Sequence, residues 1–219
     1  MIIQSTKEAT REELIQRINE LQKENKYLRD ENAIYRNETI QFLKDIEWEF
    51  TEKIDGTNIR IYWDGHKVSY YGRTDKAQIP TQLMNKLIEL FGGNINEEMF
   101  EQKFGATPVM LIGEGYGAKI QKCGGDYRQD NNFILFDVCI NDKYLSRDNV
   151  NNIANYFGIE SVPVIFSGHL QKGIDFVKTK PNSTIGTAKM EGLVARPKVE
   201  LYDKNGNRLI VKIKVCDFE

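Results

Sequence analysis

The sequence changes character at residue 47, and this change limits what the chain can fold into. No glycine or proline occurs before Gly56, and charged and long-chain helix formers dominate residues 6–46, which predicts one helix there. From Trp48 onward, short apolar runs alternate with turn residues, the pattern of strands and hairpins. The chain therefore divides into an N-terminal helical segment, residues 1–46, and a domain of residues 47–219.

The N-terminal segment carries a heptad pattern. Its apolar side chains recur at alternating steps of four and three, with two asparagines in the same register: Leu14, Ile18, Leu21, Asn25, Leu28, Asn32 and Tyr35. A buried asparagine at such a position favours a paired, in-register coiled coil. One interpretation is a homodimer through residues 6–46, and the other is a single helix lying along the second domain.

The second domain is expected to be α+β, with antiparallel sheets flanked by helices. Apolar alternation predicts strands near 50–62, 67–71, 108–114, 133–140, 162–166, 192–196 and 209–215. Helical spacing predicts helices over 81–91, 96–104 and 148–157, the last ending at Gly158.

Composition excludes several classes of protein. A net charge of −2 does not fit a strongly basic protein that coats nucleic acid by bulk attraction. Cys123, Cys139 and Cys216 show no CxxC spacing, so neither a disulfide framework nor a zinc site is indicated. No apolar run approaches the roughly 20 residues of a membrane span, and the N-terminus lacks a secretory signal. We expect a cytoplasmic protein that does not bind membranes.

The segment Glu52-Lys53-Ile54-Asp55-Gly56-Thr57-Asn58 carries a K-x-D-G motif. By itself this motif does not indicate a functional site, because a solvated lysine before an ordinary Asp-Gly turn gives the same pattern. Further polar motifs follow in a fixed order: Gly72-Arg73-Thr74, Gly113-Glu114, Phe136-Asp137, Glu191-Gly192 and Lys212-Ile213-Lys214. The ordered set favours a functional site over isolated coincidences.

This set resembles motifs I, III, IIIa, IV and V of the covalent nucleotidyltransferase superfamily, which comprises RNA ligases, DNA ligases and mRNA capping enzymes. The resemblance covers roughly residues 48–219. Gly72-Arg73-Thr74, residues 117–122 and the closing Lys-x-Lys-x-x-Asp-Phe are most similar to the bacteriophage RNA ligase 2 group. That group has histidine where this chain has Asp55. The chain also ends five residues after Lys214, so we expect no C-terminal domain, competent self-adenylation and restricted sealing.

The resemblance implies an ATP-grasp-like nucleotidyltransferase domain with ATP and Mg²⁺ as cofactors. Lys53 would attack the α-phosphorus of ATP and carry AMP covalently, before AMP is passed to RNA with 5′-phosphate and 3′-hydroxyl ends for end joining or RNA repair. An amine attacks only when uncharged, so neighbouring cations are needed. Lys212 and Lys214 stand two residues apart on a strand and project to one face, where they can supply that repulsion and hold the triphosphate.

The remaining roles also follow from the resemblance. Phe136 would stack on adenine, and Glu114 would accept hydrogen bonds from ribose. Asp55 would orient the nucleophile loop, and backbone groups beside Glu52 would read the adenine edge. Two residues, Arg73 and Asn58, would position phosphate and RNA termini, while Glu191 and Asp137 are the expected metal ligands.

Other interpretations remain open at this stage. The same chemistry serves a DNA ligase or a GTP-using capping enzyme, and a catalytically idle dimer that binds nucleotide or RNA is a third. A candidate RNA-binding face consists of basic residues in the second half of the chain: Lys119, Lys122, Arg128, Lys178, Lys180 and Lys189. These residues are equally compatible with solvated loops.

Overall fold

The computed structural model describes residues 37–74, 76–203 and 205–218. The chain separates into two compact units, residues 1–46 and residues 47–219. In the first unit, helix α2 (Glu38–Phe42) follows Asn37, whose backbone is extended and whose side chain accepts the Ile40 N–H at 3.2 Å. An extended capping residue begins a new helix, so the prediction of one unbroken helix to residue 46 is wrong at this point. The heptad positions 14–35 lie outside the described residues.

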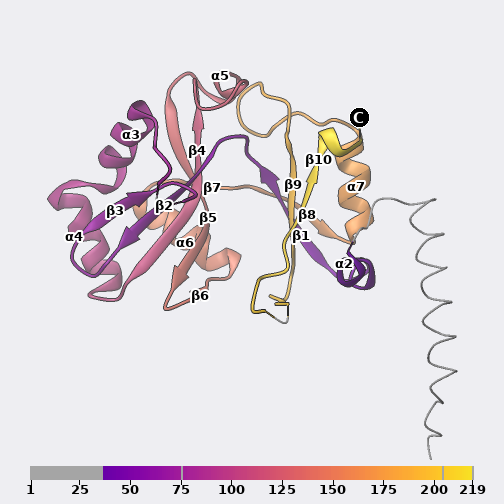
Figure 1. Cartoon of the computed structure of the whole chain (residues 1–219), viewed down its shortest axis with the longest axis horizontal. Helices are drawn as coiled ribbons and strands as arrows, with labels where there is room; N and C mark the ends of the chain where they lie inside the picture. Colours follow the sequence, from indigo (N-terminus) through magenta and orange to yellow (C-terminus); the bar gives the residue numbers. More distant parts are fainter. Residues whose placement is uncertain (1–36, 75, 204, 219) are drawn as a thin grey trace, which may run out of the picture. The chain divides into compact units, whose positions relative to one another are not determined.

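Residues 47–219 form two largely antiparallel sheets (Figure 1). Sheet A has the order β10-β9-β1-β8 and comprises β1 (Trp48–Lys53), β8 (Val164–Gly168), β9 (Gly192–Pro197) and β10 (Val211–Lys214). Sheet B has the order β3-β2-β4-β5-β6 and comprises β2 (Thr57–Trp63), β3 (Val68–Tyr71), β4 (Val109–Gly117), β5 (Asn131–Ile140) and β6 (Lys143–Tyr144). A short strand, β7 (Glu160–Ser161), pairs parallel to β5.

Helices flank both sheets, as predicted for the α+β class. Helices α3 (Thr81–Phe91) and α6 (Arg147–Phe157) pack against β5, and α4 (Gly93–Phe104) packs against α3. Helix α7 (Leu170–Lys178) lies beside sheet A in Figure 1 and contacts β9 and β10. Two short elements complete the fold, α5 (Gly124–Tyr127) and the 3-10 helix η1 (Val215–Phe218). Among the residues described, no helix is long and apolar enough to cross a membrane.

The packing of α3 against sheet B explains why its apolar spacing predicts a helix. Leu83, Leu87 and Phe91 recur on one face of the helix, and each is 0% exposed. The Phe91 ring meets the Phe133 ring of β5 with centroids 5.4 Å apart. Each large apolar side chain buried in this way contributes about 2 kcal/mol. Packing of α3 on β5 therefore fixes the half of the domain that carries β2, β4 and β5.

Helix α7 is the longest of the elements that the sequence does not predict, the others being the short α5, β6, β7 and η1. The run Ser167-Gly168-His169 is typical of a surface loop, whereas the structure places His169 at the N-cap of α7. A Cβ at Gly173 would lie 2.2 Å from the Phe50 ring of β1. The glycine therefore lets α7 approach sheet A closely, a tertiary requirement that outweighs its low helix propensity.

Candidate active site

Residues of both sheets line a cleft of about 600 Å³. The predicted site residues that line it are Glu52, Lys53, Asn58, Arg73, Glu114, Phe136, Asp137, Lys212 and Lys214. Glu191 contacts two of these lysines directly. Residues far apart in the sequence are thus gathered at one place in the fold.

Lys53 ends β1 and Lys214 ends β10, and Glu191 directly precedes β9, the strand that lies between them in sheet A. The register places Lys53 and Lys214 on either side of Gly192, the first residue of β9. Lys53 Nζ donates to Glu191 Oε2 at 2.5 Å, and Lys214 Nζ lies 3.6 Å from Glu191 Oε1. The Lys53 and Glu191 side chains are 19% and 23% exposed, so the pair is accessible from the cleft.

Gly192 is required for this arrangement. Its φ is +157°, and a Cβ there would lie 2.1 Å from the carbonyl oxygen of Ile213 in β10. Any larger residue would push β9 and β10 apart. Glycine after Glu191 therefore brings the carboxylate of Glu191 between the two lysines.

The loop after β1 is held against sheet B at a second glycine. A Cβ at Gly56 would lie 2.4 Å from the carbonyl oxygen of Gly115 in β4, which explains the glycine of the K-x-D-G motif. The side chain of Gln121 donates to the Gly56 carbonyl at 2.9 Å, and the Asp55 N–H donates to Tyr127 Oη at 3.4 Å. Tyr127 is a site neighbour that no motif in the sequence indicates. Burial and then Glu191 raise the pKa of Asp55, while Lys53 and Lys214 lower it.

Glu114 and Asn58 face each other across β2 and β4 and both line the cleft. Burial raises the pKa of Glu114 to about 7, although nearby Lys53 opposes the shift. Near neutral pH this side chain therefore exchanges between a carboxylate, which only accepts hydrogen bonds, and a carboxylic acid, which also donates one.

Glu52 is a buried carboxylate, 1% exposed. It accepts hydrogen bonds from the hydroxyl groups of Ser183 and Thr184 and from the Thr184 N–H at 2.9 Å. The Glu52 N–H donates to the Pro163 carbonyl at 3.1 Å. Glu52 therefore ties residues 183–184 to β1, next to Lys53. The polar pair Ser183-Thr184 looks like part of an ordinary loop, so the sequence around it does not predict the contact with Glu52.

Asp137, one of the two expected metal ligands, lies at the cleft beside two arginines. Its side chain is buried, and its Oδ2 is 2.9 Å from Arg196 Nη2 and 3.0 Å from Arg208 Nη1. Two guanidinium groups therefore hold one carboxylate oxygen, whereas Asp137 Oδ1 is buried with no hydrogen-bond partner. Phe136, one residue earlier, is half-buried and lines the cleft.

Arg73 and Lys212 are exposed at the cleft. The segment that carries Arg73 is fixed by Arg60, whose Nε donates to the Gly72 carbonyl at 3.0 Å. Arg73 itself therefore extends into the cleft from a backbone that is anchored at the preceding residue.

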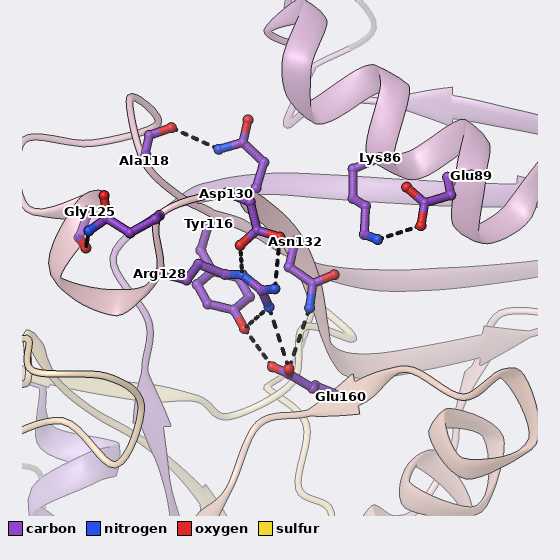
Figure 2. Close-up of polar contacts among 11 residues, drawn as sticks. Lys86, Glu89, Tyr116, Ala118, Gly125, Arg128, Asp130, Asn132 and Glu160 are labelled. Atoms are coloured by element: carbon purple, nitrogen blue, oxygen red, sulfur yellow. Dashed lines mark hydrogen bonds and ion pairs between the residues drawn. The ribbon is translucent and has the colours of Figure 1, made fainter.

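The residues of the proposed basic face differ in their environment: Arg128 is paired with other side chains, and the five lysines are exposed. Figure 2 shows Arg128 in a network in which its Nε donates to Asp130 at 2.6 Å and its Nη1 donates to Tyr116 Oη at 3.4 Å. Tyr116 Oη donates in turn to Glu160 at 2.5 Å. The charge of Arg128 is thus compensated by neighbouring carboxylates, which makes this arginine a weaker candidate for contact with an RNA phosphate. The other five members of the face, Lys119, Lys122, Lys178, Lys180 and Lys189, are all exposed.

Comparisons with known proteins identify the family of the chain and proteins that share its fold. A family model described as RNA ligase matches residues 46–214. Structures of Naegleria gruberi RNA ligase share the fold. A lysine-to-methionine mutant with AMP and Mn is 18% identical, with a TM-score of 0.63 over 83% of this chain and 53% of that chain. The same ligase with PPi is 19% identical, with a TM-score of 0.61 over 83% and 53%.

A lysine-to-alanine mutant of that ligase with ATP and Mn is 17% identical and has a TM-score of 0.63, over 83% of this chain and 52% of that chain. The chain thus spans about half the length of these structures. Among curated proteins, none matches the chain.

Proposed function

Since the chain belongs to the RNA ligase family, we propose that it is an ATP-dependent RNA ligase in which Lys53 becomes covalently attached to AMP. The observation that carries the proposal is the meeting of Lys53, Glu191 and Lys214 beside a cleft that Lys212 also lines. Two lysines, Lys53 and Lys214, contact Glu191, and Lys212 lines the same cleft, so positive charge gathers where a triphosphate would lie. An anionic nucleotide therefore complements the cleft.

The first step is attack of Lys53 Nζ on the α-phosphorus of ATP. A nitrogen–phosphorus bond forms while the bond from phosphorus to the pyrophosphate oxygen breaks, and pyrophosphate leaves with the electron pair. The Lys53 ammonium must lose its protons in this step, and Glu191 Oε2 already accepts a hydrogen bond from it at 2.5 Å. We assign Glu191 as the first proton acceptor, and Lys212 and Lys214 as the cations that hold the phosphates.

Phe136, Glu114 and Asn58 complete the nucleotide site in this proposal. The Phe136 ring offers an apolar face to the planar adenine, and Glu114 accepts hydrogen bonds from ribose. Asp55 orients the nucleophile loop through the contact of its N–H with Tyr127. The backbone around Glu52, held by its buried carboxylate, reads the edge of the adenine.

A divalent metal fits the site only as a hydrated ion. The described residues contain no group of three or more His, Cys, Asp or Glu side chains that could hold a metal. Glu191 is the carboxylate that we assign to the ion, and Asp137, whose Oδ2 is held by two arginines, has Oδ1 left as a second candidate ligand. Mg²⁺ commonly binds through one carboxylate, waters and substrate phosphates, and when bound it would neutralise phosphate charge during transfer.

The later steps require RNA. AMP passes from Lys53 to an RNA 5′-phosphate, and a 3′-hydroxyl then displaces AMP to join the ends. Arg73 at the cleft and the exposed lysines at positions 119, 122, 178, 180 and 189 are the RNA contacts that we assign. End joining in cytoplasmic RNA repair is the inferred role, since three free cysteines suit a reducing compartment. Pairing of two chains through residues 6–46 is part of the proposal and would show as a dimer mass in sedimentation equilibrium.

The proposal is tested with ATP labelled at the α-phosphate in the presence of Mg²⁺, followed by denaturing electrophoresis. We expect label on the wild-type chain, none on Lys53→Ala, and unchanged label on Lys67→Ala, an exposed lysine in the turn before β3 used as the control. Label persisting on Lys53→Ala would refute the nucleophile. Label from GTP but not from ATP would favour a capping enzyme.

A second assay separates RNA from DNA as the substrate. The adenylated protein is mixed with 5′-labelled RNA or DNA strands, either single or as a nicked duplex, and the products are resolved by size. Adenylated or joined RNA supports the proposal. Joining of DNA alone would point to a DNA ligase, and binding of ATP without any label would point to an idle descendant.

A further inference from the structure

Phe136 lies in a β-bulge. In the β4–β5 ladder Ile112 is opposite Asp137, whereas Gly113 is opposite Leu135, so Phe136 is the extra residue without a partner on β4. A bulged residue leaves the regular ladder and can turn its side chain towards a site. This accounts for a phenylalanine that lines the cleft from within an otherwise buried strand.

The bulge leaves the Phe136 carbonyl to accept hydrogen bonds from two arginines. Arg147 Nη2 donates to it at 3.0 Å and Arg196 Nη1 donates to it at 3.3 Å. Arg147 is the first residue of α6, and Arg196 belongs to β9 in sheet A. Two guanidinium groups from different elements thus fix the backbone of the one residue that the ladder does not hold.

Arg147 also reaches sheet A through charge. Its Nε lies 3.6 Å from Glu49 Oε1, and Glu49 is the residue of β1 opposite Arg196. The Arg147 side chain is 10% exposed, so its contacts are set by packing rather than by solvent. Because Lys53 stands four residues further along β1, Arg147 connects the strand of the proposed nucleophile to the proposed adenine platform on β5.

We propose that Arg147 is a positioning residue for ATP, which acts by holding the Phe136 bulge so that the ring faces the cleft. This inference rests on the proposed function, because it assumes that Phe136 stacks on adenine. The Arg147 guanidinium does not line the cleft and is not assigned a contact with the nucleotide. Removing its donors should therefore weaken ATP binding through Phe136 alone, and leave the chemistry of bound ATP largely intact.

The test measures the dissociation constant of ATP by calorimetry on the full chain in a Lys53→Ala background, where no covalent step consumes the ligand. Arg147→Met keeps the length of the side chain and removes every donor. We expect it to weaken ATP binding about tenfold, the effect of one charge-assisted hydrogen bond. Arg147→Lys, which restores a single donor and the charge, should recover part of the loss. Glu49→Gln removes the ion pair but keeps the carbonyl contacts, and should change binding by about twofold or less.

A double-mutant cycle distinguishes positioning from a general structural role. In a Phe136→Ala background, Arg147→Met should weaken ATP binding by less than about threefold, because the ring that it positions is absent. An equal tenfold loss in both backgrounds, or no loss with Phe136 present, would overturn the proposal. Unfolding midpoints of all variants are compared, and Arg147→Lys is used for the cycle if Arg147→Met does not fold.

A kinetic measurement in the otherwise wild-type chain completes the test. Arg147→Met should raise the ATP concentration that half-saturates lysine labelling, while the labelling rate at saturation changes little. A lower saturating rate at unchanged half-saturation would contradict positioning. If the wild-type chain takes no label but the Lys53→Ala chain binds ATP in the predicted pattern, the proposed function fails and the role of Arg147 stands. If the Lys53→Ala chain binds no ATP, both are wrong.

Discussion

Replacing Glu114 by glutamine should stabilise the protein at pH 8 and leave it nearly unchanged at pH 4. Burial raises the pKa of Glu114 from 4.5 to about 7, against the opposing effect of Lys53. The folded state therefore prefers the protonated side chain at a pH where the unfolded chain has already lost that proton. Glutamine has a similar shape and carries no charge at any pH, so it removes this conflict.

The size and direction of the effect follow from proton linkage. Below pH 4.5 both states of the wild-type protein bind the proton, and Glu114 contributes no pH dependence. Between 4.5 and about 7 only the folded state retains it, so stability falls as the pH rises. Above about 7 the fall is complete. At about 1.4 kcal/mol per pH unit, this interval corresponds to a difference of about 3 kcal/mol between the variant and the wild type.

The assay is urea unfolding of both proteins at half-unit steps from pH 4 to pH 8.5. Burial also raises the pKa of Asp55, so the wild-type curve alone mixes several groups. The difference between the two curves isolates Glu114. Two pH profiles that run parallel would refute the reasoning. In a Lys53→Met background the opposing charge is absent, so the difference should develop over a wider window that ends at higher pH.

Three further substitutions probe the site. Gly56→Ala places a methyl group 2.4 Å from the Gly115 carbonyl and should lower the unfolding free energy by about 2 kcal/mol in urea titrations, since backbone must move; an unchanged midpoint would contradict the close approach. Ser183→Ala removes one donor to buried Glu52 and should cost about 1 to 2 kcal/mol in the same assay, whereas no loss would mean that this hydroxyl is not needed. Glu191→Gln should slow labelling by α-labelled ATP at least about a hundredfold with the fold intact by circular dichroism; near-normal labelling would exclude Glu191 as the proton acceptor.

Local pattern was sufficient for most elements of the second domain. The spacing of Leu83 and Leu87 predicts α3 with the bounds that the structure shows, and Gly158 ends α6 in the left-handed conformation expected of a helix C-cap. These predictions succeed because one face of a helix meets a core whatever lies beyond it. The same reasoning does not predict α7, because Gly173 looks like a helix breaker until its close contact with Phe50 is known.

The ordered motifs likewise identified most residues of the cleft, but not their partners. Lys212 and Lys214 share a face because a strand alternates, and that follows from sequence alone. The assignment of Asp137 to a metal did not anticipate Arg196 and Arg208, which come from β9 and from the segment before β10. Contacts between residues of different sheets depend on how the sheets pack together, and residues close together in the sequence do not specify that packing.

The sequence by itself determined the class of fold and most of the residues that meet at the cleft, because strand alternation, helical spacing and motif order are properties of neighbouring residues. Only the tertiary structure decided how those residues are held. Glu52 meets Ser183 across 131 positions of the chain, and the bulge at Phe136 exists only once β4 and β5 have paired. Such contacts depend on which strands pair and in which register, and this is settled by the packing of the whole domain.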